Sequence, residues 1–240
     1  MPSISVVLPA YNEEANLPRI VPAVVDVASR LASDYEVIVV DDGSGDRTAA
    51  VTEGLSRTYP TVKLVRHEVN RGYGGALWTG FTSASKDLVF FTDSDNQFDV
   101  NELEKLAALI DTADMVIGYR APRRDPAIRR LNAWGWNVLV NLLFGYTARD
   151  IDCAFKLFWR RVLDTVQVES RGATFSAELL VRARRAGFTI REVPVKHLPR
   201  TAGKQTGARL SVILRAFREL LAFRRSLGRS DQGARSAGAG

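Results

Sequence analysis

An apolar run and an acidic segment adjoin in the stretch Leu88-Val89-Phe90-Phe91-Thr92-Asp93-Ser94-Asp95-Asn96-Gln97. Its first half is a short, continuous apolar run, which is typical of a strand buried on both faces of a parallel sheet. Its second half is acidic and polar, and it starts where the apolar run stops. Similar runs recur at residues 4–8, 36–40, 62–65 and 115–117. The pattern predicts a sheet whose strands end in polar loops.

Helical segments alternate with these runs. Apolar residues recur at helical spacing between Leu17 and Leu31, and residues 47–59, 73–85 and 102–110 supply three further crossovers. Strands that alternate with helices predict an α/β fold, a Rossmann-like, doubly wound, mixed but mostly parallel sheet with flanking helices.

The second half of the chain has a different rhythm. A helix is expected from Ile128 through the apolar stretch 131–146, and its Trp134 and Trp136 suit either the core or a membrane interface. Further elements are expected along the chain, namely a strand at 155–159, a helix at 174–186, a strand at 189–195, a mobile loop at 199–207, an amphipathic basic helix at 208–226 and a disordered tail at 227–240.

The composition is that of an ordinary globular protein. Of the 240 residues, 46% are hydrophobic and 25% are charged, which excludes collagen-like and wholly disordered chains. Cys153 is the single cysteine, so no internal disulfide or multi-thiolate metal site is possible, in keeping with a reducing compartment. No signal peptide is expected in residues 1–14. No spanning helix is expected either, because the stretch 131–146 contains three asparagines and is shorter than the ~20 apolar residues that a span needs.

The net charge of +6 is concentrated at one end of the chain. Residues 1–199 carry 24 basic and 25 acidic side chains, whereas residues 200–240 carry 9 and 2. The first 199 residues are therefore slightly acidic, and we expect no nucleic-acid partner. In the expected helix 208–226, arginines border an apolar face, so this helix either lies on an anionic membrane or docks on the protein's own core.

Four polar segments follow the predicted strands, at residues 9–14, 41–44, 70–75 and 92–97. Ligands of open parallel sheets bind at the carboxyl ends of the strands, so these segments are expected to form one cleft.

Asp93 and Asp95 are the most informative pair in that cleft. Two carboxylates spaced two apart can hold Mg²⁺ or Mn²⁺, which completes its coordination with water and substrate phosphates. The alternative is a strand-terminating turn with solvated carboxylates. The other segments of the cleft favour the metal site.

The segment from Asp41 to Ser44 has two interpretations. Asp41 and Asp42 hold a base or ribose, or they form only the turn and cap before the next helix. Gly72 belongs to a glycine-rich turn that lacks the dinucleotide fingerprint, and we interpret it as allowing close approach of a ligand or of backbone.

Together these segments resemble the inverting family 2 glycosyltransferases, which have the GT-A fold. The resemblance rests on residues 7–14, 39–44, 70–72, 93–97 and 150–157 and runs from about residue 3 to about residue 208. Within the family the chain looks most like the polyprenyl-phosphate (dolichyl-phosphate) mannose synthase branch. It departs from that branch at Ala154, where glycine is usual, and in the loop 197–207.

The resemblance implies a set of site residues. Asp93, Asp95 and Gln97 are expected to hold the metal and the donor diphosphate, with Asp95 acting in catalysis. Substrate contacts are expected from Pro9, Ala10, Tyr11, Glu13, Asp41, Asp42, Gly72, Asp93, Ser94, Arg120 and Lys204. The chain is expected to form one GT-A domain over residues 1–207, with a nucleotide-sugar half at 1–118 and an acceptor half with a closing loop at 119–207.

The remaining candidates carry charge chemistry. Arg200 and Lys204 are expected to neutralise phosphate oxygens, Arg200 with a catalytic role, unless they are only solvated loop charges. Asp152, or else Asp150, is the candidate general base for a hydroxyl acceptor, whereas an anionic polyprenyl phosphate needs little or no base. The alternative for Asp152 is a structural carboxylate. Arg120, Arg129 and Arg130 are candidates for binding the acceptor phosphate.

The leading hypothesis is a metal-dependent inverting hexosyltransferase. It takes mannose or glucose from a donor of the GDP-mannose or UDP-glucose type and gives it to a polyprenyl phosphate at the cytoplasmic face of a membrane. The alternatives are a glycan or lipid hydroxyl as acceptor, and a noncatalytic module that binds a nucleotide or a membrane. The oligomeric state is left open.

Overall fold

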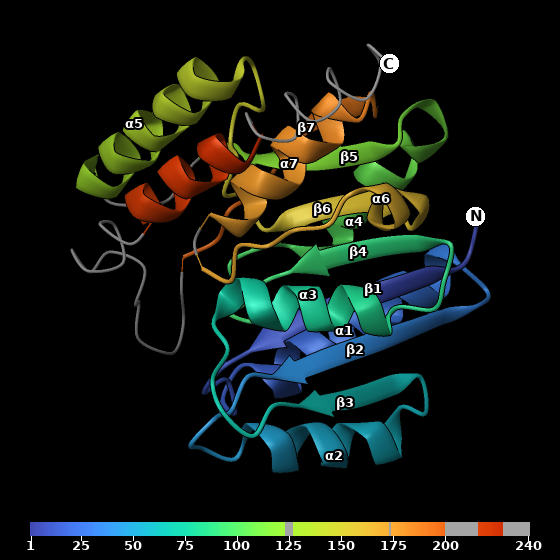
Figure 1. Cartoon of the computed structure of the whole chain (residues 1–240). Coiled ribbons are helices and arrows are strands. Elements are labelled where there is room, and N and C mark those ends of the chain that lie inside the picture. Colours follow the sequence, from blue (N-terminus) through green and yellow to red (C-terminus); the bar gives the residue numbers. More distant parts are fainter. Residues whose placement is uncertain (123–126, 173, 200–215, 228–240) are drawn as a thin grey trace, which may run out of the picture.

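The computed structural model describes residues 1–122, 127–172, 174–199 and 216–227, and its described part is built on one seven-stranded sheet (Figure 1). The strand order is β3-β2-β1-β4-β6-β5-β7. The strands are β1 (Ile4–Ala10), β2 (Tyr35–Asp41), β3 (Val62–Arg66), β4 (Leu88–Thr92), β5 (Met115–Arg120), β6 (Phe155–Trp159) and β7 (Ile190–Val195). β6 runs antiparallel to both of its neighbours, β4 and β5, and the other pairs are parallel. The predicted mixed, mostly parallel sheet is confirmed.

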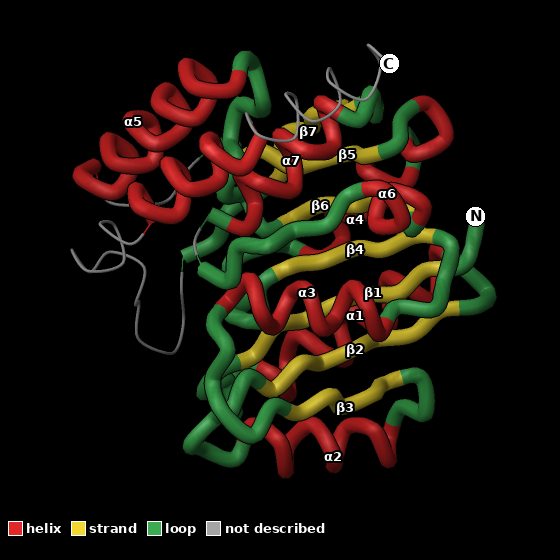
Figure 2. The backbone as a smooth tube through the Cα atoms, viewed as in Figure 1, coloured by secondary structure: helices red, strands yellow, loops and turns green. Residues whose placement is uncertain are grey.

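Helices cover both faces of the sheet (Figures 1 and 2). The α-helices are α1 (Leu17–Leu31), α2 (Thr48–Thr58), α3 (Tyr73–Ser83), α4 (Leu103–Ala107), α5 (Ala127–Phe144), α6 (Arg161–Thr165) and α7 (Phe175–Arg185). Two short 3₁₀ turns, η1 (Val100–Glu102) and η2 (Ile110–Thr112), flank α4. Figure 1 shows α3 and α7 in front of the sheet and α1 and α4 behind it. This arrangement is the doubly wound one that the alternation of strands and helices predicts.

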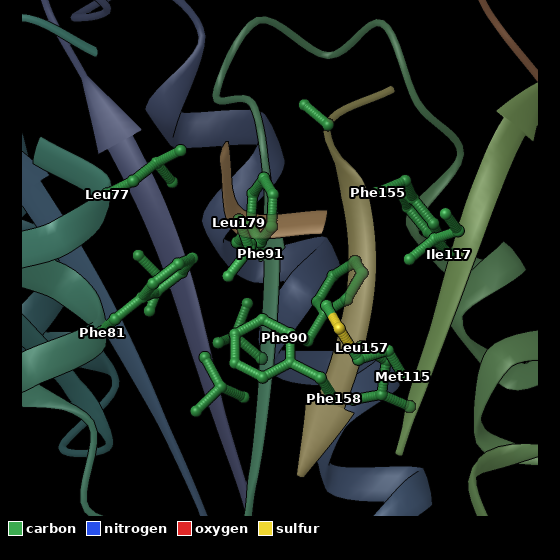
Figure 3. Close-up of a cluster of buried hydrophobic side chains, with 14 of the residues drawn as sticks. Leu77, Phe81, Phe90, Phe91, Met115, Ile117, Phe155, Leu157, Phe158 and Leu179 are labelled. Carbon is green, nitrogen blue, oxygen red and sulfur yellow. The ribbon is translucent and has the colours of Figure 1, made fainter. Parts of the chain in front are cut away.

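The core lies between the central strands and the helices on each face. β1 and β4 are buried at every position, as expected for strands covered on both sides. Figure 3 shows Phe90 and Phe91 of β4 beside Leu157 and Phe158 of β6. Phe81 of α3 packs against Phe91 and Phe158 with ring centroids 5.4 and 5.3 Å apart. Each such aromatic pair contributes about 0.5–1.5 kcal/mol beyond the burial of its area.

Two expected elements differ in the structure. The single helix expected at 102–110 is divided into η1, α4 and η2, because the chain tightens into 3₁₀ turns at both ends of α4. Of the expected helix 208–226, residues 216–227 are helical, and Leu220, Phe223 and Leu227 are buried in the core cluster. In the described part of this segment, the helix docks on the protein's own core. Arg209 and Arg215 lie outside the described residues, as does the tail beyond Leu227.

Candidate active site

The predicted polar segments that follow the strands lie at one edge of the sheet. β1 to β5 and β7 run in one direction and β6 in the other, so the ends of the former and the start of β6 share this edge. The Ser94 hydroxyl donates to the carbonyl oxygen of Pro9 at 2.8 Å, which joins the end of β4 to that of β1. The Asn12 amide donates to the Ser44 hydroxyl at 2.9 Å, and the Gly45 amide donates to Asn12 Oδ1 at 2.9 Å. These two hydrogen bonds join the loop after β1 to the loop after β2.

Asp93 and Asp95 lie directly after β4, as predicted. Asp95 is buried, and its Oδ1 accepts a hydrogen bond from the Gln97 amide at 3.0 Å. Burial and the negative charge of Asp95 raise the pKa of Asp93 to about 7. The two carboxylates thus repel each other, and a cation between them would relieve the repulsion.

This pair suits a metal that binds few protein ligands. Among the described residues, no group of three or more His, Cys, Asp or Glu side chains could hold an ion. A site with two carboxylates leaves coordination positions for water and phosphate oxygens, which Mg²⁺ and Mn²⁺ characteristically use. Asp93 and Asp95 therefore fit the metal of the sequence prediction.

The segment after β7 is fixed beside this loop. The Leu198 amide donates to the Gln97 carbonyl at 2.7 Å, and Gln97 Nε2 donates back to the Leu198 carbonyl at 3.4 Å. Phe98 and His197 form an isolated antiparallel bridge with their rings in edge contact. Residues 196–199 therefore lead towards Arg200 and Lys204, which lie outside the described residues.

Tyr73 is a site residue that the sequence reasoning missed. It is the first residue of α3, and desolvation and the Asp93 carboxylate raise its pKa well above the ordinary tyrosine value. It therefore stays protonated and can donate a hydrogen bond to a carboxylate or a phosphate oxygen. Its position directly after Gly72, inside the predicted post-strand segment 70–75, was the available signal.

Gly72 allows close approach of backbone. Its φ is +83°, and an added Cβ would lie 2.8 Å from the carbonyl oxygen of Arg171. The same carbonyl accepts a hydrogen bond from Gly74 at 3.0 Å. A cavity of about 390 Å³ lies beside this turn, lined by Arg71 and Gly75 of the predicted segment 70–75 and by Trp78, Thr79 and Arg171.

Asp41 and Asp42 are both buried and bonded within the chain. Asp41 accepts from the Ser44 amide at 3.0 Å, as in a turn. Asp42 accepts from the amides of Arg71 and Gly72 at 2.8 and 2.9 Å, and it pairs with His67 Nδ1 at 2.7 Å. The Asp41 bond matches the turn alternative, whereas Asp42 binds the loop after β3 and His67, which neither interpretation predicted. Nucleotide contacts by the two carboxylates stay a prediction.

Arg120 and Asp150 form a buried ion pair that the sequence did not predict. The Arg120 backbone amide, Nε and Nη2 donate to Asp150 at 3.1, 2.7 and 2.6 Å. Burial opposes the charge of Arg120, but the Asp150 carboxylate outweighs it and raises the Arg120 pKa. Asp150 is thereby committed to Arg120, and a phosphate contact by Arg120 would have to share the guanidinium with this carboxylate.

Asp152 remains the candidate base. Asp152 is exposed as a residue, but neighbouring groups desolvate its carboxylate. Desolvation raises the pKa of Asp152 to about 6, with Arg120 opposing and Asp150 adding to the rise. A carboxylate with this pKa accepts a proton better than an ordinary aspartate at neutral pH.

Lys156 is the second site residue that the sequence reasoning missed. It lies in β6 and is fully buried, and its ammonium group donates to the carbonyl oxygens of Ile151 and Cys153, on either side of Asp152. Burial lowers its pKa. A lysine inside an apolar strand was the signal for this role.

The remaining predicted residues lie at the same edge or outside the description. Pro9 and Ala10 are buried at the end of β1, and the Tyr11 ring that follows them is half exposed. Glu13 accepts from Asn16 Nδ2, and its amide donates to Thr48 Oγ1. Arg130 is exposed on α5, and the side chain of Arg129 lies outside the described residues.

The family follows from the sequence match. The model described as "Glycosyl transferase family 2" matches residues 5–167. The chain belongs to this family. It therefore contains a family 2 glycosyltransferase domain, and the matched range includes Asp93, Asp95 and Asp152.

Two of three similar relatives of this glycosyltransferase carry lipid-phosphate names. The chain is 32% identical over 210 residues to dolichyl-phosphate beta-glucosyltransferase ALG5A of Trichomonas vaginalis, covering 80% of the chain and 65% of the relative. It is 34% identical to glycosyltransferase AglD of Haloferax volcanii, covering 82% and 33%. It is 30% identical to undecaprenyl-phosphate 4-deoxy-4-formamido-L-arabinose transferase of Enterobacter sp., covering 84% and 61%. The chain thus spans a third to two thirds of the length of these curated relatives.

Solved structures share the fold of this glycosyltransferase. Glucosyl-3-phosphoglycerate synthase of Mycobacterium tuberculosis, in complex with Mn²⁺, UDP and glucosyl-3-phosphoglycerate, superposes with a TM-score of 0.71 at 24% identity, over 93% of this chain and 80% of that one. The complex of the same synthase with Mn²⁺ and UDP-glucose gives a TM-score of 0.70 at 25% identity, over 93% and 79%. The chain therefore has the GT-A fold.

Proposed function

We propose that this glycosyltransferase moves a hexosyl group, mannose or glucose, from a nucleoside diphosphate sugar to a polyprenyl phosphate, with inversion at the anomeric carbon. The observation that carries the proposal is that Asp93, Asp95 and Asp152 all lie near Tyr73, whose pKa is raised by desolvation and by these three carboxylates. Desolvation raises the pKa of Asp93 to about 7 and that of Asp152 to about 6. The names of two relatives, a dolichyl-phosphate and an undecaprenyl-phosphate transferase, support this acceptor class.

The donor is proposed to bind on the side of Asp93. Asp93, Asp95 and Gln97 would hold Mg²⁺ or Mn²⁺, and the ion would neutralise the charge that develops on the departing diphosphate. The metal in the two complexes of the structural neighbour supports this choice. The protonated Tyr73 hydroxyl beside Asp93 can donate to a phosphate oxygen, and the half-exposed Tyr11 ring can stack on a nucleobase.

The acceptor is proposed to bind on the side of Asp152. A phosphate oxygen of the acceptor attacks the anomeric carbon, the new carbon–oxygen bond forms, and the bond to the nucleoside diphosphate breaks. When the acceptor phosphate still carries a proton, Asp152 takes it, since a carboxylate with a pKa of about 6 matches the second ionisation of a phosphate monoester. Arg200 and Lys204 are proposed to neutralise phosphate oxygens from the closing loop.

A hydroxyl acceptor is the second candidate. The raised pKa of Asp152 favours it as well, because a sugar or lipid hydroxyl needs a general base. The two candidates separate in one acceptor panel, in which the purified chain receives labelled UDP-glucose or GDP-mannose with Mn²⁺ and either polyprenyl phosphate or polyprenol. Transfer to the phosphate alone supports the proposal. Transfer to the alcohol supports the second candidate and contradicts the proposal.

The place of action follows from the acceptor. A polyprenyl chain is held in a bilayer, so we propose that the enzyme works as a peripheral protein at the cytoplasmic face of a membrane. In the described ranges, no helix is both long enough and apolar enough to cross a bilayer.

A further inference from the structure

Helix α5 exposes an unusual amount of apolar side chain. Its outward stripe, as we call it, consists of Ile128, Leu131, Trp134, Val138 and Leu142. Leu142 is 79% exposed and Ile128 is 73% exposed. The spacing of three and four residues places all five on one face of the helix.

The opposite face of α5 is apolar too, but it is packed. Val140 is buried, and Leu139 and Leu143 pack against the core cluster. Trp136 and Phe144 contact Phe217 and Phe223 of the helical residues 216–227, with ring centroids 6.2 and 5.2 Å apart. A helix that is apolar on both faces is normally covered on both faces.

Two of the three asparagines of α5, Asn137 and Asn141, bind other parts of the chain and do not make the stripe hydrophilic, whereas Asn132 is exposed. Asn137 Nδ2 donates to the Arg149 carbonyl at 3.0 Å, and Asn137 Oδ1 accepts from the Ile151 amide at 3.2 Å. Asn141 likewise accepts from the Thr147 amide at 2.8 Å and donates to the Ala148 carbonyl at 3.2 Å. Both side chains thus fix the segment that leads to Asp152.

Apolar and basic side chains continue beyond α5. Figure 1 shows α5 and residues 216–227 side by side at one end of the molecule. Tyr146, Phe217 and Leu221 are exposed there.

The sequence of α5 contains two arginines and no acidic residue. In residues 216–227, Arg218, Arg224 and Arg225 are exposed, whereas the acidic Glu219 accepts a hydrogen bond from Thr174.

We propose that the outward stripe of α5 is a membrane-docking surface that lies on an anionic bilayer. Its apolar side chains enter the interface, and Arg130 of α5 and the exposed arginines of residues 216–227 meet anionic head groups. The proposal rests on the proposed function for the location of the acceptor. Of the two helices for which the sequence left a membrane role open, it assigns the docking surface to α5, because Leu220, Phe223 and Leu227 of the other pack inwards.

Docking on this stripe would also bring the active site close to the membrane surface. Because Asn137 and Asn141 bind residues 147–151, α5 and the turn that carries Asp152 are joined by four hydrogen bonds. A bilayer under α5 therefore lies next to the acceptor side of the cleft. A lipid phosphate would reach Asp152 without leaving the membrane surface.

The first experiment measures vesicle binding. The full chain and the variant Leu131→Ser/Leu142→Ser are floated with phosphatidylcholine vesicles that contain or lack phosphatidylglycerol. We expect the wild type to bind the anionic vesicles and the variant to bind about tenfold less. Val69→Ser, at a residue that is 68% exposed far from α5 in sequence, is the control and should bind as the wild type does. Equal binding by the double variant would overturn the proposal.

The second experiment reports the location of the stripe directly. Cys153 is the single native cysteine and is buried, so Leu142→Cys can be labelled selectively with an environment-sensitive dye. We expect a blue shift of its emission on addition of anionic vesicles and none for labelled Val69→Cys. If the emission of labelled Leu142→Cys is blue-shifted relative to labelled Val69→Cys already without vesicles, the chain itself covers the stripe. If the blue shift appears only as the protein concentration rises, a second copy covers it. Either result would contradict the proposal.

Activity separates this proposal from the proposed function. With a short-chain, water-soluble polyprenyl phosphate, the double variant should retain wild-type kcat/KM, whereas with vesicle-embedded acceptor it should lose about tenfold. If the wild type uses no polyprenyl phosphate but still binds vesicles through α5, the proposed function fails and the docking surface stands.

Discussion

The Lys156 ammonium group donates a hydrogen bond to the backbone carbonyl oxygen of Ile151, 3.1 Å away, beneath the turn that carries Asp152. A second bond, to the Cys153 carbonyl, holds the other side of that turn. A fully buried lysine is costly unless its donors are used, and here they are used on backbone. Hydrogen bonds from the Lys156 ammonium group and a hydrogen bond from the Ile151 amide to Asn137 of α5 therefore fix the turn that carries Asp152, the candidate base.

Replacing Lys156 by methionine tests this support. Lys156→Met keeps the length of the side chain but leaves the two carbonyls without their donor. We expect kcat to fall about 10–100-fold, because the Asp152 turn loses its position, while KM for the donor stays near the wild-type value. The exposed Lys105→Met is the matched control, and steady-state kinetics with a thermal melt of each variant provide the measurement. A lower melting temperature with unchanged kcat would leave Lys156 only a structural role.

The pKa of Asp152 predicts how activity depends on pH. Desolvation raises that pKa from the ordinary aspartate value to about 6, so the carboxyl is protonated below pH 6 and is a base above it. We expect kcat/KM to rise with pH through about 6 and then to level off. The acceptor phosphate ionises in the same range, so the profile is compared with that of Asp152→Asn. This variant should lose activity most near pH 6, where much of the acceptor phosphate still carries a proton, and it should lose the part of the rise that belongs to the enzyme. Superimposable profiles would exclude Asp152 as the base.

Asp93 and Asp95 are expected to account for the metal dependence. Asp93→Asn and Asp95→Asn each remove one of two proposed carboxylate ligands, so metal affinity and turnover should both fall by at least about 10²-fold. Calorimetric titration with Mn²⁺ measures the first effect, and transfer assays with and without EDTA measure the second. Asp99→Asn is the control, an acidic residue four positions beyond Asp95. Full activity of the wild type in EDTA would contradict the metal site.

Glu36 predicts a change of stability in acid that is independent of the site. Burial alone would raise the pKa of Glu36, but hydrogen bonds from Lys63, Ser5 and Ser85 outweigh it and lower the pKa to about 2. A lowered pKa means that the stabilisation is complete above the unfolded value, about 4.5, and is lost as the pH falls towards 2. Glu36→Gln should therefore cost about 1–3 kcal/mol of unfolding free energy at pH 7 and progressively less below pH 4.5. Urea unfolding of both proteins at pH 7 and at a pH below 4.5 measures this difference in unfolding free energy. A difference that does not depend on pH would contradict the lowered pKa of Glu36.

The strands and the polar segments after them were predictable because both depend on local patterns. Apolar runs mark buried strands, and in a parallel sheet the segments after them share one edge, which placed Asp93 and Asp95 correctly. The strand at Phe155–Trp159 was predicted at its observed bounds.

The pairings of buried charges were not predictable in this way. Arg120 meets Asp150 because β6 inserts antiparallel between β4 and β5, a choice of partner that no local pattern specifies. The inward use of Asn137 and Asn141 is of the same kind. In the sequence they only shortened an apolar stretch, whereas in the structure they bind residues 147–151.

A transfer assay on polyprenyl phosphate tests directly whether this enzyme uses a lipid phosphate as its acceptor. The full chain is incubated with Mn²⁺, labelled UDP-glucose or GDP-mannose and a polyprenyl phosphate, and the label is followed into the organic phase. The proposed function predicts a hexosyl phosphate lipid with inverted anomeric configuration, formed by the wild type and not by Asp93→Asn. Donor hydrolysis or transfer to hydroxyl acceptors, with no label in the phosphate lipid, would contradict it.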